Sequence, residues 1–211
     1  MIALSHSISR FAFAATIAIA ATIGVVASSA SAVTTLPQYP SRGTENPVNY
    51  TLTAARTGDI TAWFTGTTAS YSESLGMMIN GVATGIVGLN NKSSVYGDKL
   101  VLGRANAGDS LVFFTNVITT NKTYYSDKAL NADGVNHVFS AAYAGDAKVP
   151  AGTYVGFEDL WNGGDFNYFD ETFVFDNVST AVPEPASWAL MVVGFGMVGY
   201  ARRRRQIAVA A

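Results

Sequence analysis

The sequence contains no cysteine and few charged residues. Of its 211 residues, none is cysteine and only 13% are Asp, Glu, Lys or Arg. The absence of cysteine excludes disulfides, thiolate chemistry and cysteine-based zinc sites. Low charge together with abundant Gly, Thr, Asn and Ser is unlike a helical cytoplasmic enzyme. The composition is closer to that of a strand-rich secreted protein.

Residues 1–32 have the features of a secretory signal peptide. Arg10 gives a weakly positive start, and the apolar run Phe11–Val26 follows it. Small residues at Ala30 and Ala32 then form an A-x-A cleavage site. We therefore expect cleavage after Ala32, which removes the leader from the mature protein.

Histidine is almost absent from the mature chain. His6 leaves with the signal peptide, so His137 is the only histidine that remains. A Ser-His-Asp triad would have to use His137, and no nucleophile elbow accompanies it. Zinc or iron sites with several histidines are excluded by the count. No glycine-rich phosphate loop occurs, so hydride-transfer and phosphoryl-transfer enzymes are not indicated.

The C-terminal segment 182–205 has the pattern of a membrane anchor. Its apolar run Ala186–Ala201 has 16 residues, which as a helix would span about 24 Å, somewhat less than the roughly 30 Å of a bilayer core. The four arginines at 202–205 are a strong cytoplasmic-side signal, and their long side chains can cover the shortfall. Trp188 stands where an interfacial aromatic residue would anchor the outer end. The segment therefore predicts a transmembrane helix.

This segment resembles the PEP-CTERM sorting signal in its Pro-Glu-Pro-x-x-Trp-Ala form. The resemblance implies export from a Gram-negative bacterium through the general secretion machinery, transient anchoring in the inner membrane, and cleavage by an exosortase. The final location implied is the cell surface or the exopolysaccharide matrix. The same tail occurs on unrelated ectodomains, so it indicates location and not activity; residues 206–211 form a short tail beyond it. The matching residues are Pro183, Glu184, Pro185, Trp188, Ala189, Arg202, Arg203, Arg204 and Arg205.

The body of the chain predicts an all-β fold. Residues 33–47, rich in Pro and Thr, form a loose N-terminal arm, and residues 48–181 form one domain. Short runs of alternating apolar and polar residues are separated by turn signals such as Asn80-Gly81, a dipeptide typical of two-residue hairpins. We expect an antiparallel β-sandwich, jelly-roll-like. The expected strands are 48–54, 60–64, 77–79, 82–87, 99–103, 111–119, 135–143, 153–157 and 171–178.

The charge of the mature domain is concentrated in one stretch. Its eight bases are balanced by eight acids elsewhere, and no Lys or Arg lies between Lys148 and Arg202. The net negative charge therefore comes from the segment 156–177, and nucleic-acid binding is not supported. The acids of this segment are Glu158, Asp159, Asp165, Asp170, Glu171 and Asp176.

Three interpretations of these acids remain open. The first is a Ca²⁺ site, because Ca²⁺ prefers carboxylate, amide and backbone oxygens. The second is an acid–base pair for glycoside hydrolysis, and the third is a set of solvated acids without a specific contact. The loop is not an EF-hand, because its sixth position is Asp170 where glycine is needed. The candidate calcium ligands are Glu158, Asp159, Asp165, Asn167 and Asp170.

The acidic stretch also resembles a C-terminal element of secreted bacterial β-domains of undefined function. In that element a Glu-Asp pair, a glycine-rich loop and further Asp residues precede a final Phe-rich strand. Members often carry a PEP-CTERM tail, so the two resemblances agree. The matching residues are Glu158, Asp159, Gly163, Gly164, Asp165, Asp170 and Phe173–Phe175.

Aromatic residues offer an alternative function. Trp63, Trp161 and Tyr168 could form a sugar-stacking surface, which would make the domain a carbohydrate-binding module. The interpretation we favour is a non-enzymatic exported β-sandwich of the cell surface or matrix. Stabilisation by Ca²⁺ and contact with exopolysaccharide are the hypotheses that accompany it. A glycoside hydrolase ranks below both.

Overall fold

The computed structural model describes residues 35–181 together with Val193, Phe195 and Met197. The predicted signal peptide, with Ala30 and Ala32, lies outside the described residues. So do the Pro-Glu-Pro element, Trp188, Ala189 and the arginines at 202–205. In the part of the chain that is described, no helix is both long and apolar enough to cross a bilayer. The sorting helix and the leader therefore stay predictions.

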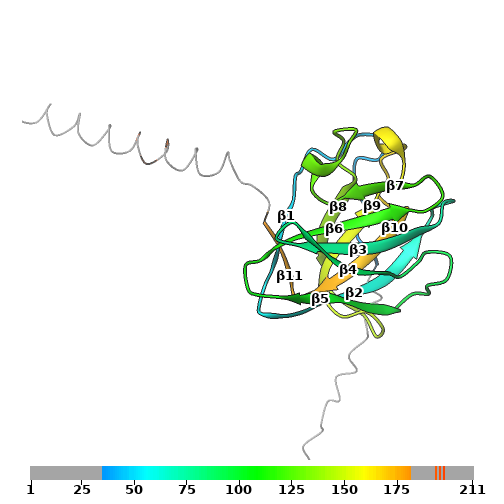
Figure 1. Ribbon diagram of the computed structural model, residues 1–211. Coiled ribbons are helices and arrows are strands. Elements are labelled where there is room, and N and C mark those ends of the chain that lie inside the picture. Colours follow the sequence, from blue (N-terminus) through cyan, green and yellow to red (C-terminus); the bar gives the residue numbers. More distant parts are fainter. Residues whose placement is uncertain (1–34, 182–192, 194, 196, 198–211) are drawn as a thin grey trace, which may run out of the picture. The chain divides into compact units, whose positions relative to one another are not determined.

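The described residues fold into two antiparallel β-sheets (Figure 1). In the first sheet the strand order is β11-β1-β6-β3-β4, and β7 pairs with β6; in the second it is β5-β2-β10-β9-β8. The predicted antiparallel β-sandwich is confirmed. The first sheet contains β1 (Thr51–Ala54), β3 (Glu73–Ile79), β4 (Val82–Gly88), β6 (Ser110–Val117), β7 (Lys122–Tyr125) and β11 (Val178–Ala181). The second contains β2 (Gly58–Thr67), β5 (Lys99–Ala105), β8 (Val138–Tyr143), β9 (Gly152–Phe157) and β10 (Glu171–Asp176), and two 3₁₀ turns complete the fold, η1 (Lys128–Leu130) and η2 (Trp161–Gly163).

The core lies between the two sheets. Alternate residues of a strand point to the same face, so Phe173 and Phe175 of β10 enter the core together, and both are fully buried. Phe175 stacks on Phe113 of β6 in the other sheet, with ring centroids 3.8 Å apart. Burying aromatic rings of this size is a main source of the free energy that holds the sheets together.

The hairpin between β3 and β4 turns at the predicted dipeptide. Asn80 and Gly81 have φ values of 50° and 81°, the positive values that a type I′ turn requires at both central positions. Ile79 and Val82 pair directly across the turn. Asn80 and Gly81 are residues that tolerate this conformation, so this prediction is confirmed at the level of the backbone.

The predicted strand 171–178 is interrupted. Asn177 has a φ of 63°, and its side chain accepts a hydrogen bond from the Arg56 backbone N–H and donates one to the Arg56 carbonyl. The chain therefore leaves the second sheet at Asn177 and pairs with β1 of the first sheet as β11. β7, which the sequence pattern did not indicate, pairs with β6.

The N-terminal arm is packed against the body over its described part. Tyr39 is only 6% exposed, and its ring meets that of Tyr168 edge-on at 4.8 Å. The Gly43 N–H donates to the Asp165 carbonyl at 2.9 Å. The arm, expected to be loose, thus covers the loop between β9 and β10.

Candidate functional site: a buried cluster of acids

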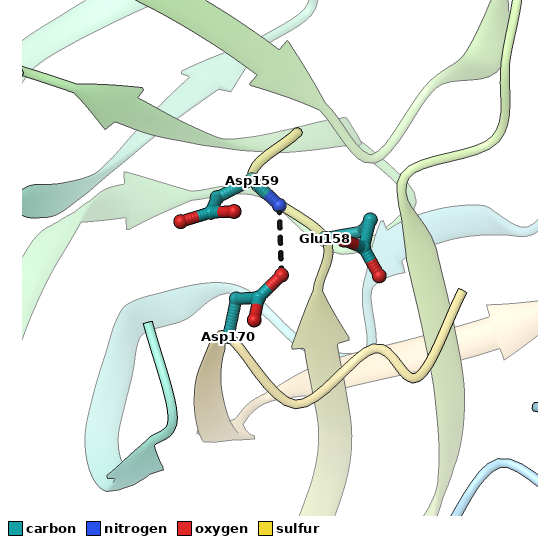
Figure 2. Close-up of side chains that lie close together, drawn as sticks. All are labelled: Glu158, Asp159 and Asp170. Carbon is teal, nitrogen blue, oxygen red and sulfur yellow. Dashed lines mark hydrogen bonds between the residues drawn. The ribbon is translucent and has the colours of Figure 1, made fainter. Parts of the chain in front are cut away.

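The pairing of β9 with β10 brings acids from two places in the chain together. Phe157 and Glu171 are register partners in this antiparallel pair, so the residue after Phe157 lies near the residue before Glu171. The Asp159 N–H donates to Asp170 Oδ2 at 3.1 Å (Figure 2). One carboxylate oxygen from each of Glu158, Asp159 and Asp170 lies within 4.8 Å of the others. Three of the five candidate calcium ligands therefore form a group.

The other two candidates have a different arrangement. The Asp165 carboxylate is exposed and accepts hydrogen bonds from the Asn167 backbone and side-chain N–H groups, at 3.1 and 2.8 Å. The Asn167 side-chain oxygen accepts from the Phe169 N–H at 2.7 Å. These contacts stabilise the turn at 165–169, and Asp165 does not belong to the group of three.

His137 positions the backbone of Glu158. The Glu158 N–H donates to the His137 carbonyl at 3.0 Å, and His137 Nδ1 lies 2.8 Å from the Glu158 carbonyl oxygen. His137 Nε2 lies 3.0 Å from Asp133 Oδ2. Both ring nitrogens therefore lie within hydrogen-bonding distance of an oxygen atom. The imidazole is fully buried and stacks on Tyr124, so it serves as an internal clamp.

The glycines of the loop allow it to approach Glu158 closely. Gly164 has a φ of 49°, and a Cβ placed on it would lie 2.7 Å from Glu158 Oε1. Phe166 and Tyr168 also have positive φ values, of 49° and 56°. Non-glycine residues in this region carry strain of order 1–3 kcal/mol each, and they persist only where the surroundings impose the conformation.

Two further carboxylates extend the group into the core. Glu171 begins β10 and Glu73 begins β3, so they come from different sheets. The Thr115 hydroxyl of β6 lies 2.7 Å from Glu171 Oε2 and 3.4 Å from Glu73 Oε2. We call the five residues the acid cluster. Their exposed fractions are Glu73 0%, Glu158 0%, Asp159 4%, Asp170 9% and Glu171 0%.

Glu73 was not among the sequence candidates, although a signal existed. It shares the inward face of its strand with Leu75 and Met77, which alternate with it and are fully buried. Glu171 shares its face with Phe173 and Phe175 in the same way. An acid that alternates with core residues along a strand, and so shares their inward face, is thus the pattern that predicts a buried acid.

No base among the described residues forms an ion pair with the acid cluster. The ion pairs among the described residues involve other acids, namely Asp176, Asp59, Glu45 and Asp133. Burial removes water from the charged form and raises the pKa of Glu171 to about 8, with the nearby Asp159 charge adding to the rise and the Thr115 hydrogen bond opposing it. Burial also raises the pKa values of Glu73, Glu158 and Asp170, and neighbouring carboxylates contribute to each rise.

Several oxygens of the acid cluster lack a partner. The Oε1 atoms of Glu73, Glu158 and Glu171 are buried and have no hydrogen-bond partner among the described residues. Buried polar atoms are almost always paired, because an unpaired one costs about 1–3 kcal/mol. These atoms are therefore available to a ligand that accepts electron pairs from oxygen.

A surface hollow leads to the acid cluster. It has a volume of about 280 Å³, and Asp159 and Asp170 form part of its wall. The rest of the wall comes from the loop between β2 and β3 and from Leu160. An ion the size of Ca²⁺ could reach Asp159 and Asp170 from solvent by this route. Glu73, Glu158 and Glu171 are fully buried and do not line the hollow.

The three aromatic candidates for sugar stacking do not form one surface. Tyr168 is fully buried, and its hydroxyl donates to the Asn136 carbonyl at 3.1 Å. Trp63 packs against a second apolar cluster that includes Val149. Trp161 is 48% exposed, and Lys122 Nζ lies 4.7 Å from the centre of its ring. Only Trp161 of the three offers an exposed ring.

Two family models match the chain. Residues 181–205 match the PEP-CTERM protein-sorting motif, and residues 97–177 match a domain of unknown function, DUF4114. The chain is therefore of the class that carries a PEP-CTERM motif, and the predicted resemblance to exosortase-sorted proteins is confirmed. The motif implies an exported protein that is anchored transiently in the membrane and processed by an exosortase.

The match to DUF4114 covers strands β5 to β10 and includes four members of the acid cluster, but it begins after Glu73. The matched residues leave out β2, although β2 lies between β5 and β10 in the second sheet. The match therefore begins inside the sandwich. No curated protein matches the chain, and no solved structure matches it.

Proposed function

We propose that this protein is a non-enzymatic component of the cell surface or exopolysaccharide matrix, and that its sandwich domain is stabilised by Ca²⁺. The observation that supports this proposal is the group formed by Glu158, Asp159 and Asp170, which is buried, forms no ion pair with a base among the described residues, and adjoins a surface hollow. Carboxylate oxygens are the ligands that Ca²⁺ prefers, and its six to eight positions leave room for water from the hollow.

A bound cation offsets a cost that this group otherwise imposes. Ionised carboxylates in a buried site are destabilising unless they are paired or coordinate a metal. Without an ion, burial favours the protonated form of these side chains and raises the pKa values of Glu158 and Asp170. At neutral pH an ion of charge +2 would neutralise most of the negative charge of three carboxylates and coordinate their oxygens.

Glycoside hydrolysis finds less support. Raised pKa values are expected of a general acid, but a hydrolase needs its two carboxyls on either side of a cleft that admits a sugar. Glu158 and Glu171 are fully buried, and the adjacent hollow of about 280 Å³ is lined by Asp159 and Asp170 instead. Exposed carbohydrate-stacking rings are likewise limited to Trp161 among the three candidates.

The calcium proposal can be tested on the full chain in mild detergent. Thermal unfolding, followed by circular dichroism, is measured in excess EDTA and again with millimolar Ca²⁺, a range suited to extracellular calcium modules. Saturation at 100 times the dissociation constant corresponds to a stabilisation of about 2.7 kcal/mol. Asp170→Asn should abolish the rise in Tm.

The matched control is Asp59→Asn. Asp59 is exposed on β2 and forms an ion pair with Arg104 at 3.5 Å. This variant should respond to Ca²⁺ as the wild type does. Equal melting temperatures for the wild type in EDTA and in Ca²⁺ would reject calcium stabilisation.

A further inference from the structure

The inner part of the acid cluster joins the two sheets. Glu73 lies on β3 of the first sheet, Glu171 lies on β10 of the second, and Thr115 lies between them. The group of three acids proposed above to bind Ca²⁺ belongs only to the segment that connects β9 and β10. The two parts of the cluster therefore have different structural positions.

Hydrogen bonding inside the protein leaves the inner pair unsatisfied. The Thr115 hydroxyl has one proton, which it donates to Glu171 Oε2 at 2.7 Å, so it cannot also donate to Glu73 Oε2 at 3.4 Å. Oε1 of Glu73 and Oε1 of Glu171 have no partner among the described residues, although both side chains are fully buried. These atoms and the Thr115 oxygen are free to coordinate a cation.

Asp159 connects the inner pair to the outer group. It belongs to the group with Glu158 and Asp170, and its carboxylate also neighbours that of Glu73, whose pKa burial raises and Asp159 raises further. A carboxylate has two oxygens and can bridge two metal ions. One Ca²⁺ would balance two of the five negative charges, whereas two ions would balance four.

We propose that the acid cluster binds two divalent cations that share Asp159. The outer ion contacts Glu158 and Asp170, and the inner ion contacts Glu73, Glu171 and the Thr115 hydroxyl. This inference rests on the proposed calcium function, and it adds a second site that ties β3 to β10. Removal of the inner ion would loosen the contact between the sheets as well as the loop.

The experiment counts ions. The full chain, stripped with chelator and held in mild detergent near pH 7.5, is titrated with CaCl₂ by calorimetry, and the stoichiometry is checked by native mass spectrometry. We expect two Ca²⁺ per wild-type chain. Glu171→Gln should leave one, because the amide keeps an acceptor for Thr115 but lacks the negative charge.

Companion variants assign the sites. Glu73→Gln should also leave one ion, and Asp159→Asn should weaken both binding steps at least about tenfold. Asp59→Asn should keep two. Circular dichroism spectra of all variants establish that they are folded before the ions are counted.

Each outcome has one meaning. Two ions in the wild type and one in Glu171→Gln support the proposal. A single ion in the wild type overturns it and leaves the outer calcium site standing, in which case protons satisfy the inner pair. Two ions in both proteins place the second ion elsewhere and overturn it as well. No bound ion overturns the calcium function itself.

Discussion

In the absence of a divalent cation, the folded domain should lose stability as the pH rises from 5 to 8. Glu171 carries this effect most clearly. Its pKa is about 8 in the folded protein, against an ordinary value of 4.5. Between these two values the folded state holds a proton that the unfolded state has released, so raising the pH favours unfolding. Below pH 4.5 both states are protonated and the penalty is absent.

The size of the effect follows from the width of this interval. A difference of 3.5 pH units between 4.5 and about 8, at about 1.36 kcal/mol per unit, gives at most about 5 kcal/mol for Glu171 alone. For a chain of this size, 1 kcal/mol shifts Tm by about 2–4 °C. The expected fall in Tm is therefore about 10–20 °C, and the raised pKa values of Glu73 and Glu158 act in the same direction.

Carboxyl groups with lowered pKa values do not change stability between pH 5 and 8. Burial acts to raise the pKa of Asp133, but hydrogen bonds from Asn162, Val135 and His137 outweigh it and hold the pKa below its ordinary value. A depressed carboxyl contributes stability above its unfolded pKa and loses it only as the pH falls further. Its effect therefore lies below pH 4, outside the range measured.

The assay is thermal unfolding of the full chain at pH 5, 6, 7 and 8, with EDTA in one series and millimolar Ca²⁺ in the other. We expect the EDTA series to fall and the Ca²⁺ series to stay nearly level, because the ions replace the protons. Glu171→Gln should make the EDTA series fall less steeply, because Glu73 and Glu158 keep their raised pKa values, whereas Asp59→Asn should follow the wild type. A Tm that is constant or rises from pH 5 to 8 in EDTA would refute the argument.

Three other predictions concern the loop, the core and the tail. Gly164→Ala should destabilise the domain and weaken Ca²⁺ binding, because its Cβ would lie 2.7 Å from Glu158 Oε1. Gly108→Ala is the control, because Gly108 also has a positive φ, of 85°, but a Cβ there would have nothing within 4 Å. Thermal unfolding of both variants in chelator and in Ca²⁺ separates the steric cost from the backbone cost. Phe175→Ala should cost about 3–5 kcal/mol, because it removes a fully buried ring stacked between the sheets, and chemical denaturation measures this. A chain ended after Ala181 should leave the membrane fraction, and an unchanged distribution on cell fractionation would contradict the sorting role of the tail.

Local rules account for most of the fold that could be predicted. Alternating side chains identified the strand around Phe173, and the Asn80-Gly81 dipeptide located a hairpin, which the positive φ values of both residues confirm. The interruption of the strand at Asn177 could not be predicted, because it depends on hydrogen bonds to Arg56, which is far away in the sequence. β7 escaped because four residues are too few to show a period.

In the candidate site, too, the residues that are close in sequence could be predicted and the distant one could not. Glu158, Asp159 and Asp170 are close in sequence, so a composition argument could collect them, and the register of β9 with β10 does bring them together. Glu73 lies far from them in sequence and reaches the cluster only because the sheets pack face to face. Sequence reasoning could have marked Glu73 as buried by its alternation with Leu75, but not named its partners.

The acid cluster makes the stability of the domain conditional on its surroundings. Five buried carboxylates weaken the fold when they are ionised and unpaired, whereas apolar side chains of the same volume would carry no such penalty. Each bound ion adds stability in proportion to the logarithm of its concentration above the dissociation constant. The sorting motif at 181–205 implies an exported protein, and under the two-ion proposal calcium outside the cell would set how firmly β3 is held to β10. A domain built this way would be most stable at its destination, and the two-ion stoichiometry determines whether the whole sandwich or only the loop before β10 depends on calcium.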